Sequence, residues 1–134
     1  MLTGGCVCGG VRYEVDESAL GQAGYCHCTR CQRRTGTAAS ANVSVERGAV
    51  RVTAGEELIR TWQPDPGNAK LFCGECGSAL FSHPPDDPSA RSIRLGSFDE
   101  DPGVRPEWRQ YLANAAPWEP VPDDGLAHFP QRRS

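Results

Sequence analysis

The sequence predicts one small, mostly-β domain that is held together by bound metal. Three observations carry this prediction. Short runs alternate apolar and polar residues, 15 glycines and 11 prolines punctuate the chain, and seven cysteines fall into three tight clusters. With 134 residues, 38% of them hydrophobic, the chain has material for one modest core. We therefore expect a single domain over residues 1–134.

The predicted elements are short strands with one helix. Seven runs have strand-like patterns, namely 11–15, 41–45, 50–53, 58–62, 69–72, 79–82 and 92–95. Glycine and proline turns separate most of them. The helix is predicted over 29–35, with Gly36 placed to end it. A second, weaker helical pattern covers 106–112, and we expect a loose tail over 129–134.

The cysteine spacing indicates zinc. The three clusters are Cys6-Val7-Cys8, Cys26-His27-Cys28-Thr29-Arg30-Cys31 and Cys73-Gly74-Glu75-Cys76. One or two residues between thiols allow a short loop to direct both sulfurs at one ion, whereas an unstrained disulfide within such a pair is disfavoured. An odd number of thiols also excludes complete disulfide pairing. Thiolate ligands exclude magnesium and calcium, and the spacing does not fit ferredoxin-type iron–sulfur runs.

The glycines that follow the cysteines suggest how seven thiols divide between two sites. Cys8 and Cys76 are each followed by a glycine, which permits the tight turn that aims backbone N–H groups at sulfur. We therefore assign Cys6, Cys8, Cys73 and Cys76 to one closed, structural zinc site. Such a site joins segments far apart in the chain, and metal binding would offset the entropy of closing that loop.

Cys26, Cys28 and Cys31 remain, and three protein ligands with one vacant position are typical of a catalytic zinc. Zinc at such a site deprotonates a coordinating thiol near neutral pH. Two alternatives stay open. The cluster can hold an ordinary structural zinc with a fourth ligand such as His83 or His128, or its thiols can be reduced and metal-free.

Other residues near this cluster have a functional and a structural interpretation. Arg30, Arg33 and Arg34 can bind a substrate carboxylate through guanidinium groups, or they can form a solvated face. Thr35, Gly36 and Thr37 can donate hydrogen bonds to the same pocket or simply end the helix. His27 should point away from the ligand cysteines because side chains alternate along an extended segment. Core or rim packing is expected for Trp62, Trp108 and Trp118.

Charge and hydropathy narrow the classes of partner. The net charge of −3 gives no attraction to nucleic acid or to an anionic membrane. No apolar run is long enough for a membrane span, and the first residues lack a signal-peptide pattern. We therefore expect a cytoplasmic protein with reduced thiols and a small-molecule partner. The sequence does not indicate an oligomeric state.

Five segments resemble, in order, the glutathione-dependent formaldehyde-activating enzyme family, which includes proteins of the centromere protein V type. They read GGCVCGGVRYEV, YCHCTRCQRRTGTAASANVSV, KLFCGECGSALF, LGSFDEDPGVRP and NAAPWEPVPDDGLAHFP. The resemblance implies a β-tent of small antiparallel sheets around two zinc ions. It also implies the same partition, with Cys6, Cys8, Cys73 and Cys76 on the structural zinc and Cys26, Cys28 and Cys31 on the catalytic one.

The family activity joins formaldehyde to glutathione and is classed with the carbon–sulfur lyases. The leading hypothesis is thus a zinc-dependent enzyme acting on a small thiol such as glutathione or on its aldehyde adduct. The alternative is a non-catalytic interaction domain with two structural zincs. A thiol redox protein is disfavoured, because no cysteine lies outside the clusters to serve as nucleophile.

Overall fold

The computed structural model describes residues 1–133, which form two compact units. The first unit comprises residues 1–21 and 43–104, and the second comprises 22–42 and 105–133. Strands β3 (Leu20–Cys26) and β4 (Ser40–Val45) contribute residues to both units. The prediction of a mostly-β chain with one short helix is confirmed. No helix of the described residues is long and apolar enough to cross a membrane.

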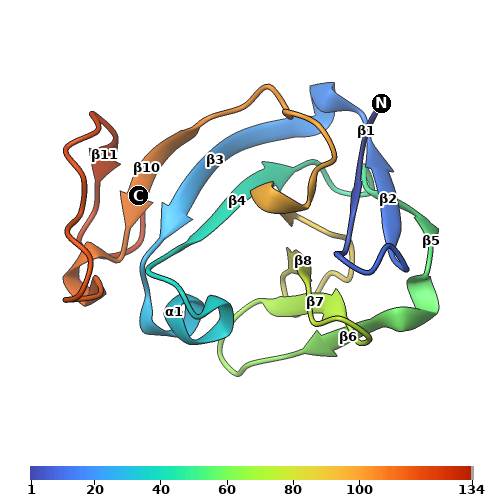
Figure 1. Ribbon diagram of the computed structural model, residues 1–134, viewed down its shortest axis with the longest axis horizontal. Helices are drawn as coiled ribbons and strands as arrows, with labels where there is room; N and C mark the ends of the chain where they lie inside the picture. Colours follow the sequence, from blue (N-terminus) through green and yellow to red (C-terminus); the bar gives the residue numbers. More distant parts are fainter. Residues whose placement is uncertain (134) are drawn as a thin grey trace. The chain divides into compact units, whose positions relative to one another are not determined.

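The first unit contains two sets of antiparallel strands. One is a three-stranded sheet in the order β1-β2-β5, formed by β1 (Leu2–Gly5), β2 (Arg12–Val15) and β5 (Arg51–Ala54) (Figure 1). The other is a meander of β6 (Ile59–Trp62), β7 (Ala69–Cys73), β8 (Ala79–His83) and β9 (Ser92–Arg94). Three 3₁₀ turns join the strands, η1 (Glu17–Ala19), η2 (Glu56–Leu58) and η3 (Leu95–Ser97).

The core of the first unit is built around Tyr13. This residue is 1% exposed. Its ring meets the rings of Phe81 and Phe98 edge-on, with centroids 5.1 Å and 5.9 Å apart. The Tyr13 hydroxyl lies 2.7 Å from the hydroxyl of Ser97, which satisfies the polar end of a buried side chain. Alternating positions of β2 point inward, so the aromatic cluster follows from the period of two in the sequence.

The second unit contains β10 (Pro106–Gln110), β11 (Ala127–His128), the helix α1 (Thr29–Thr35) and the 3₁₀ turn η4 (Leu112–Asn114). β10 runs parallel to both β3 and β11, and Figure 1 shows β10 alongside them. The chain therefore has mixed rather than purely antiparallel pairing. Gly24 on β3 is required by this pairing, because a Cβ there would lie 2.0 Å from the ring of Trp108.

The helical pattern over 106–112 is wrong, because residues 106–110 form β10 and pair with β3, so tertiary pairing overrides local propensity. The expectation of a loose tail over 129–134 is also wrong for residues 129–133, which make contacts with the second unit. The backbone N–H of Phe129 donates to the carbonyl of Arg109, and the N–H of Tyr111 donates to the carbonyl of Gln131. The guanidinium of Arg133 lies over the Trp108 ring at 4.0 Å. Ser134 lies outside the described residues.

Candidate metal centres

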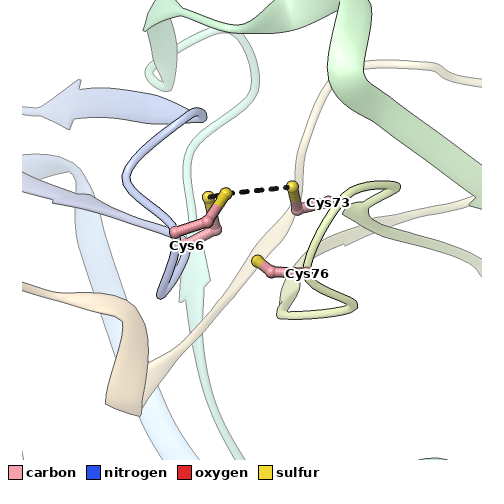
Figure 2. A group of neighbouring side chains, drawn as sticks. Cys6, Cys73 and Cys76 are labelled. Atoms are coloured by element: carbon pink, nitrogen blue, oxygen red, sulfur yellow. Dashed lines mark hydrogen bonds between the residues drawn. The ribbon is translucent and has the colours of Figure 1, made fainter.

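Four cysteines of the first unit converge on one point. Cys6 and Cys8 follow β1, Cys73 ends β7, and Cys76 lies in the turn between β7 and β8. Figure 2 shows the sulfurs of Cys6, Cys73 and Cys76 facing a common centre. The four sulfur atoms all lie within 4.8 Å of one another. The Cys6 and Cys8 sulfurs are 3.5 Å apart, and those of Cys8 and Cys73 are 3.9 Å apart.

These distances fit zinc. With zinc–sulfur bonds of about 2.3 Å, the edge of a tetrahedron of sulfurs is about 3.8 Å. The two measured separations lie on either side of this value, and both are far longer than a disulfide bond of about 2.05 Å. All seven cysteines of the chain are free thiols. Four soft ligands at this spacing form a closed donor set for one ion.

The loops around this cluster orient the sulfurs as the glycine pattern predicts. Gly9 and Gly77 both have φ of +79°, and each donates its backbone N–H to the carbonyl of the cysteine that opens its loop. The N–H of Val11 donates to the sulfur of Cys6 at 3.2 Å. Hydrogen bonds from the side chain and backbone of Ser78 lower the pKa of Cys76 to about 5, which favours the thiolate that a metal requires.

Three cysteines of the second unit form the other cluster. Cys26 ends β3, Cys28 caps the N-terminus of α1, and Cys31 lies in the first turn of that helix. Their sulfurs also lie within 4.8 Å of one another, and all three side chains are partly exposed. The group contains no histidine or carboxylate among the described residues, so neither His83 nor His128 belongs to it.

Helix capping fixes the geometry of this cluster. The Cys28 sulfur accepts a hydrogen bond from the backbone N–H of Cys31 at 3.3 Å, which is the usual role of an N-cap side chain. A hydrogen bond with Cys31, aided by burial, raises the pKa of Cys26. Gln32 donates from Nε2 to the carbonyls of His27 and Asn114, both at 2.8 Å. These bonds attach the cysteine loop to the helix and to η4.

His27 is a core histidine; the alternation of side chains predicts that it turns away from the cysteines and leaves a surface or a core position open. It is 4% exposed and does not belong to the cysteine group. Its Nε2 accepts a hydrogen bond from Nη1 of Arg109 at 3.1 Å. Burial, with a further contribution from the Arg109 charge, lowers the pKa of His27, so its ring is neutral at physiological pH.

Three arginines lie on α1 at positions i, i+3 and i+4, which share one face of a helix. Arg30 and Arg33 are exposed, and Arg34 is partly buried. Their role toward a carboxylate stays a prediction. Thr35 has a structural role, because its hydroxyl donates to the Cys31 carbonyl at 2.8 Å, and Gly36 ends the helix with φ of +69°.

Tyr25, Arg109 and Asp124 also lie near this cluster, and no sequence pattern predicts their grouping. Arg109 binds Asp124 through two nitrogens, at 3.2 and 2.9 Å, and lies 4.3 Å over the Tyr25 ring. Together with His27, these side chains stand beside the three-cysteine segment. No local pattern connects them, because Arg109 and His27 are 82 residues apart in the sequence. Of the three tryptophans, Trp108 is partly buried, whereas Trp62 and Trp118 are 41% and 65% exposed.

The comparison with known families agrees with this geometry. The family described as glutathione-dependent formaldehyde-activating enzyme matches residues 1–114, a range that includes all seven cysteines. The chain belongs to this family. Among solved structures, the chain is similar to a Rhodobacter sphaeroides protein determined by crystallography in a structural genomics programme. The two share 22% identity over 95% of this chain and 98% of that one, with a TM-score of 0.60, which shows a common fold.

Proposed function

We propose that this member of the formaldehyde-activating family binds two zinc ions and catalyses the reversible addition of glutathione to formaldehyde at the three-cysteine cluster. The observation that carries the proposal is the contrast between the two clusters. One supplies four sulfurs and leaves no position for a substrate, whereas the other supplies three sulfurs and no further ligand among the described residues.

The three cysteines hold the ion, and the supporting hydrogen bonds keep them in place. Cys28 and Cys31 are fixed by the helix cap, and the Cys26–Cys28 segment is fixed by Gln32. When bound there, zinc supplies an open coordination position and lowers the pKa of a thiol that coordinates to it. Partial exposure of all three cysteines leaves that position accessible to a substrate.

The chemistry needs no side-chain nucleophile. The thiol sulfur of glutathione forms a bond to the carbonyl carbon of formaldehyde, the carbon–oxygen π bond breaks, and the thiol proton passes to that oxygen through solvent. The product is S-hydroxymethylglutathione, and the reverse step is carbon–sulfur cleavage. We assign Arg30, Arg33 and Arg34 to the glutathione carboxylates, since they share one face of α1 and are its cationic side chains.

The first test is the number of zinc ions in protein purified without chelator, measured by elemental analysis. We expect two per chain. The second test is the rate of thiol–formaldehyde exchange, measured by NMR and compared with the spontaneous rate. Cys28→Ser should abolish the acceleration, while Thr29→Ala, an exposed neighbour that is not a ligand, should keep it.

Two results would reject the proposal. Two zincs with no acceleration by the wild-type protein would favour the alternative, a non-catalytic interaction domain with two structural ions. One zinc, retained in Cys28→Ser and lost in Cys76→Ser, would leave only the four-cysteine site as a metal site. For the arginines, Arg33→Ala should raise KM for glutathione and leave kcat nearly unchanged, because a carboxylate contact persists from the bound substrate to the transition state.

A further inference from the structure

The second unit contains a cavity that the proposed reaction does not use. Its volume is about 440 Å³, within the range of small-ligand pockets, and its polar lining comprises Tyr25, His27, Thr37, Arg109 and Glu119. None of the seven cysteines lines it. Tyr25 and His27 alternate with the metal-binding cysteines along one extended segment, so the cavity and the sulfurs take opposite faces of that segment.

His27 presents an unused hydrogen-bond donor at this cavity. Arginine is always protonated and has no acceptor, so Arg109 donates to Nε2 of His27 and the ring proton of the neutral histidine is on Nδ1. Among the described residues, Arg109 is the hydrogen-bond partner of the His27 side chain, and Nδ1 is not one of the buried polar atoms that lack a partner. This N–H group is therefore reached by solvent, and it can donate to a ligand or to a water in the cavity that His27 lines.

Arg109 has N–H groups that are not engaged in hydrogen bonds, but its positive charge is already neutralised. Three of its five N–H groups are engaged, two with Asp124 and one with His27, which leaves two N–H groups. The Asp124 carboxylate balances the guanidinium charge. Arg109 is 12% exposed and is held over Tyr25, so its orientation is fixed before any ligand binds.

Glu119 provides the uncompensated charge. It lines the cavity, is exposed, and forms no ion pair with any residue in the described part of the chain. The cavity thus has donors at its wall, from His27 and Arg109, and an unpaired acceptor with negative charge at Glu119.

We propose that this cavity binds the zwitterionic headgroup of an α-amino acid. Its carboxylate accepts from Nδ1–H of His27 and from the remaining N–H groups of Arg109, and its ammonium group pairs with Glu119. A simple anion would meet the unpaired Glu119, and a simple amine would leave the His27 donor unused. The headgroup has two sources, a free amino acid or the γ-glutamyl end of glutathione, and the second source rests on the proposed function.

The test is titration of the full chain, as purified, with L-glutamate, followed by ¹⁵N–¹H NMR. We expect saturable shifts at the amides of Thr37, Ala39 and Glu119. N-acetyl-L-glutamate, which lacks the ammonium group, should give none. Glu119→Gln should weaken L-glutamate binding about tenfold or more, because one charge-assisted hydrogen bond is lost. Glu107→Gln removes an exposed carboxylate of the same unit that does not line the cavity, and it should bind like the wild type.

Glutathione distinguishes the sources. If glutathione shifts the cavity amides and competes with L-glutamate, its γ-glutamyl end uses the cavity. If it shifts only the amides of 26–31 while L-glutamate shifts those of the cavity, the ligand is a free amino acid. The proposal is overturned if L-glutamate gives no saturable shift, if N-acetyl-L-glutamate binds equally well, or if Glu119→Gln has no effect. Any of these leaves exchange catalysis intact, and L-glutamate binding without exchange catalysis rejects the proposed function alone.

Discussion

The two cysteine clusters should differ in how much of the stability of the protein depends on them. We expect Cys76→Ser to destabilise the zinc-loaded protein about twice as much as Cys28→Ser. The two substitutions are matched, because both replace a partly buried ligand sulfur by oxygen and each leaves the other cluster untouched. The difference comes from the length of chain that each cluster closes.

The magnitude follows from loop-closure entropy. Cys8 and Cys73, whose sulfurs are 3.9 Å apart, are separated by 65 positions in the sequence. In the chain-entropy relation used for disulfides, a cross-link over that length stabilises the fold by about 4 kcal/mol. Cys26 and Cys31 are five positions apart, and the same relation gives about 2 kcal/mol. The free energy of unfolding of a typical domain is about 5–15 kcal/mol, so the loss of about 4 kcal/mol in Cys76→Ser is a large fraction of it.

The assay is urea denaturation of each variant beside the wild type, followed by circular dichroism, with zinc content measured on the same samples. Each variant should contain one zinc fewer than the wild type. Equal losses of stability in the two variants, or a larger loss in Cys28→Ser, would contradict this expectation. Either result would mean that the three-cysteine cluster has the larger structural role, and it would also weaken the assignment of catalysis to that cluster.

Three further predictions concern the rest of the fold. Burial raises the pKa of Tyr13 to about 12. The free energy of unfolding should therefore be constant below pH 10 and fall by about 3 kcal/mol as the pH rises to 12, because only the unfolded chain loses the phenol proton in that range. The urea midpoint of the wild type should fall with pH accordingly, and that of Tyr13→Phe should not. Gly24→Ala forces a Cβ against Trp108 and should cost about 1–3 kcal/mol in thermal denaturation, whereas Gly96→Ala, with open space around it, should change stability by less than about 0.5 kcal/mol. Gln32→Leu removes two hydrogen bonds of 2.8 Å and should cost about 1–3 kcal/mol in urea; an unchanged midpoint would contradict the role given to this side chain.

Local chemistry made α1 predictable. Its bounds, Thr29–Thr35, and its end at Gly36 agree with the prediction, because a capping side chain, a run without proline and a terminal glycine act within one or two turns. The seven predicted strands are all present. In β2 and β4 the alternation reports a buried face, whereas β5 and β6 have no buried residue and were indicated by β-forming residues between turns. The two cysteine groups were also predictable, because ligand spacing is a local property.

The elements that the sequence did not reveal depend on distant partners. β3 contains two glycines and no clear alternation, and its identity as a strand depends on parallel pairing with β10, more than 80 residues away. β10 opens with proline and glutamate, which are common in the first turn of a helix. It forms a strand because it pairs with β3, where the absence of a Cβ at Gly24 makes room for the Trp108 ring. Propensity is a weak prior when such a contact decides the outcome.

The same distinction separates what the chain shares with its family from what can set its specificity. The family match ends at residue 114 and contains every cysteine, so both candidate metal sites lie within the shared part. Glu119 and Asp124 lie beyond it, and they supply the free charge of the cavity and the carboxylate that neutralises Arg109. Cysteine clusters alone do not choose among substrates, because zinc accepts any small thiol. Discrimination among ligands should therefore respond to substitutions after residue 114 as well as to those at His27 and Arg109, whereas metal binding should respond only to substitutions before it.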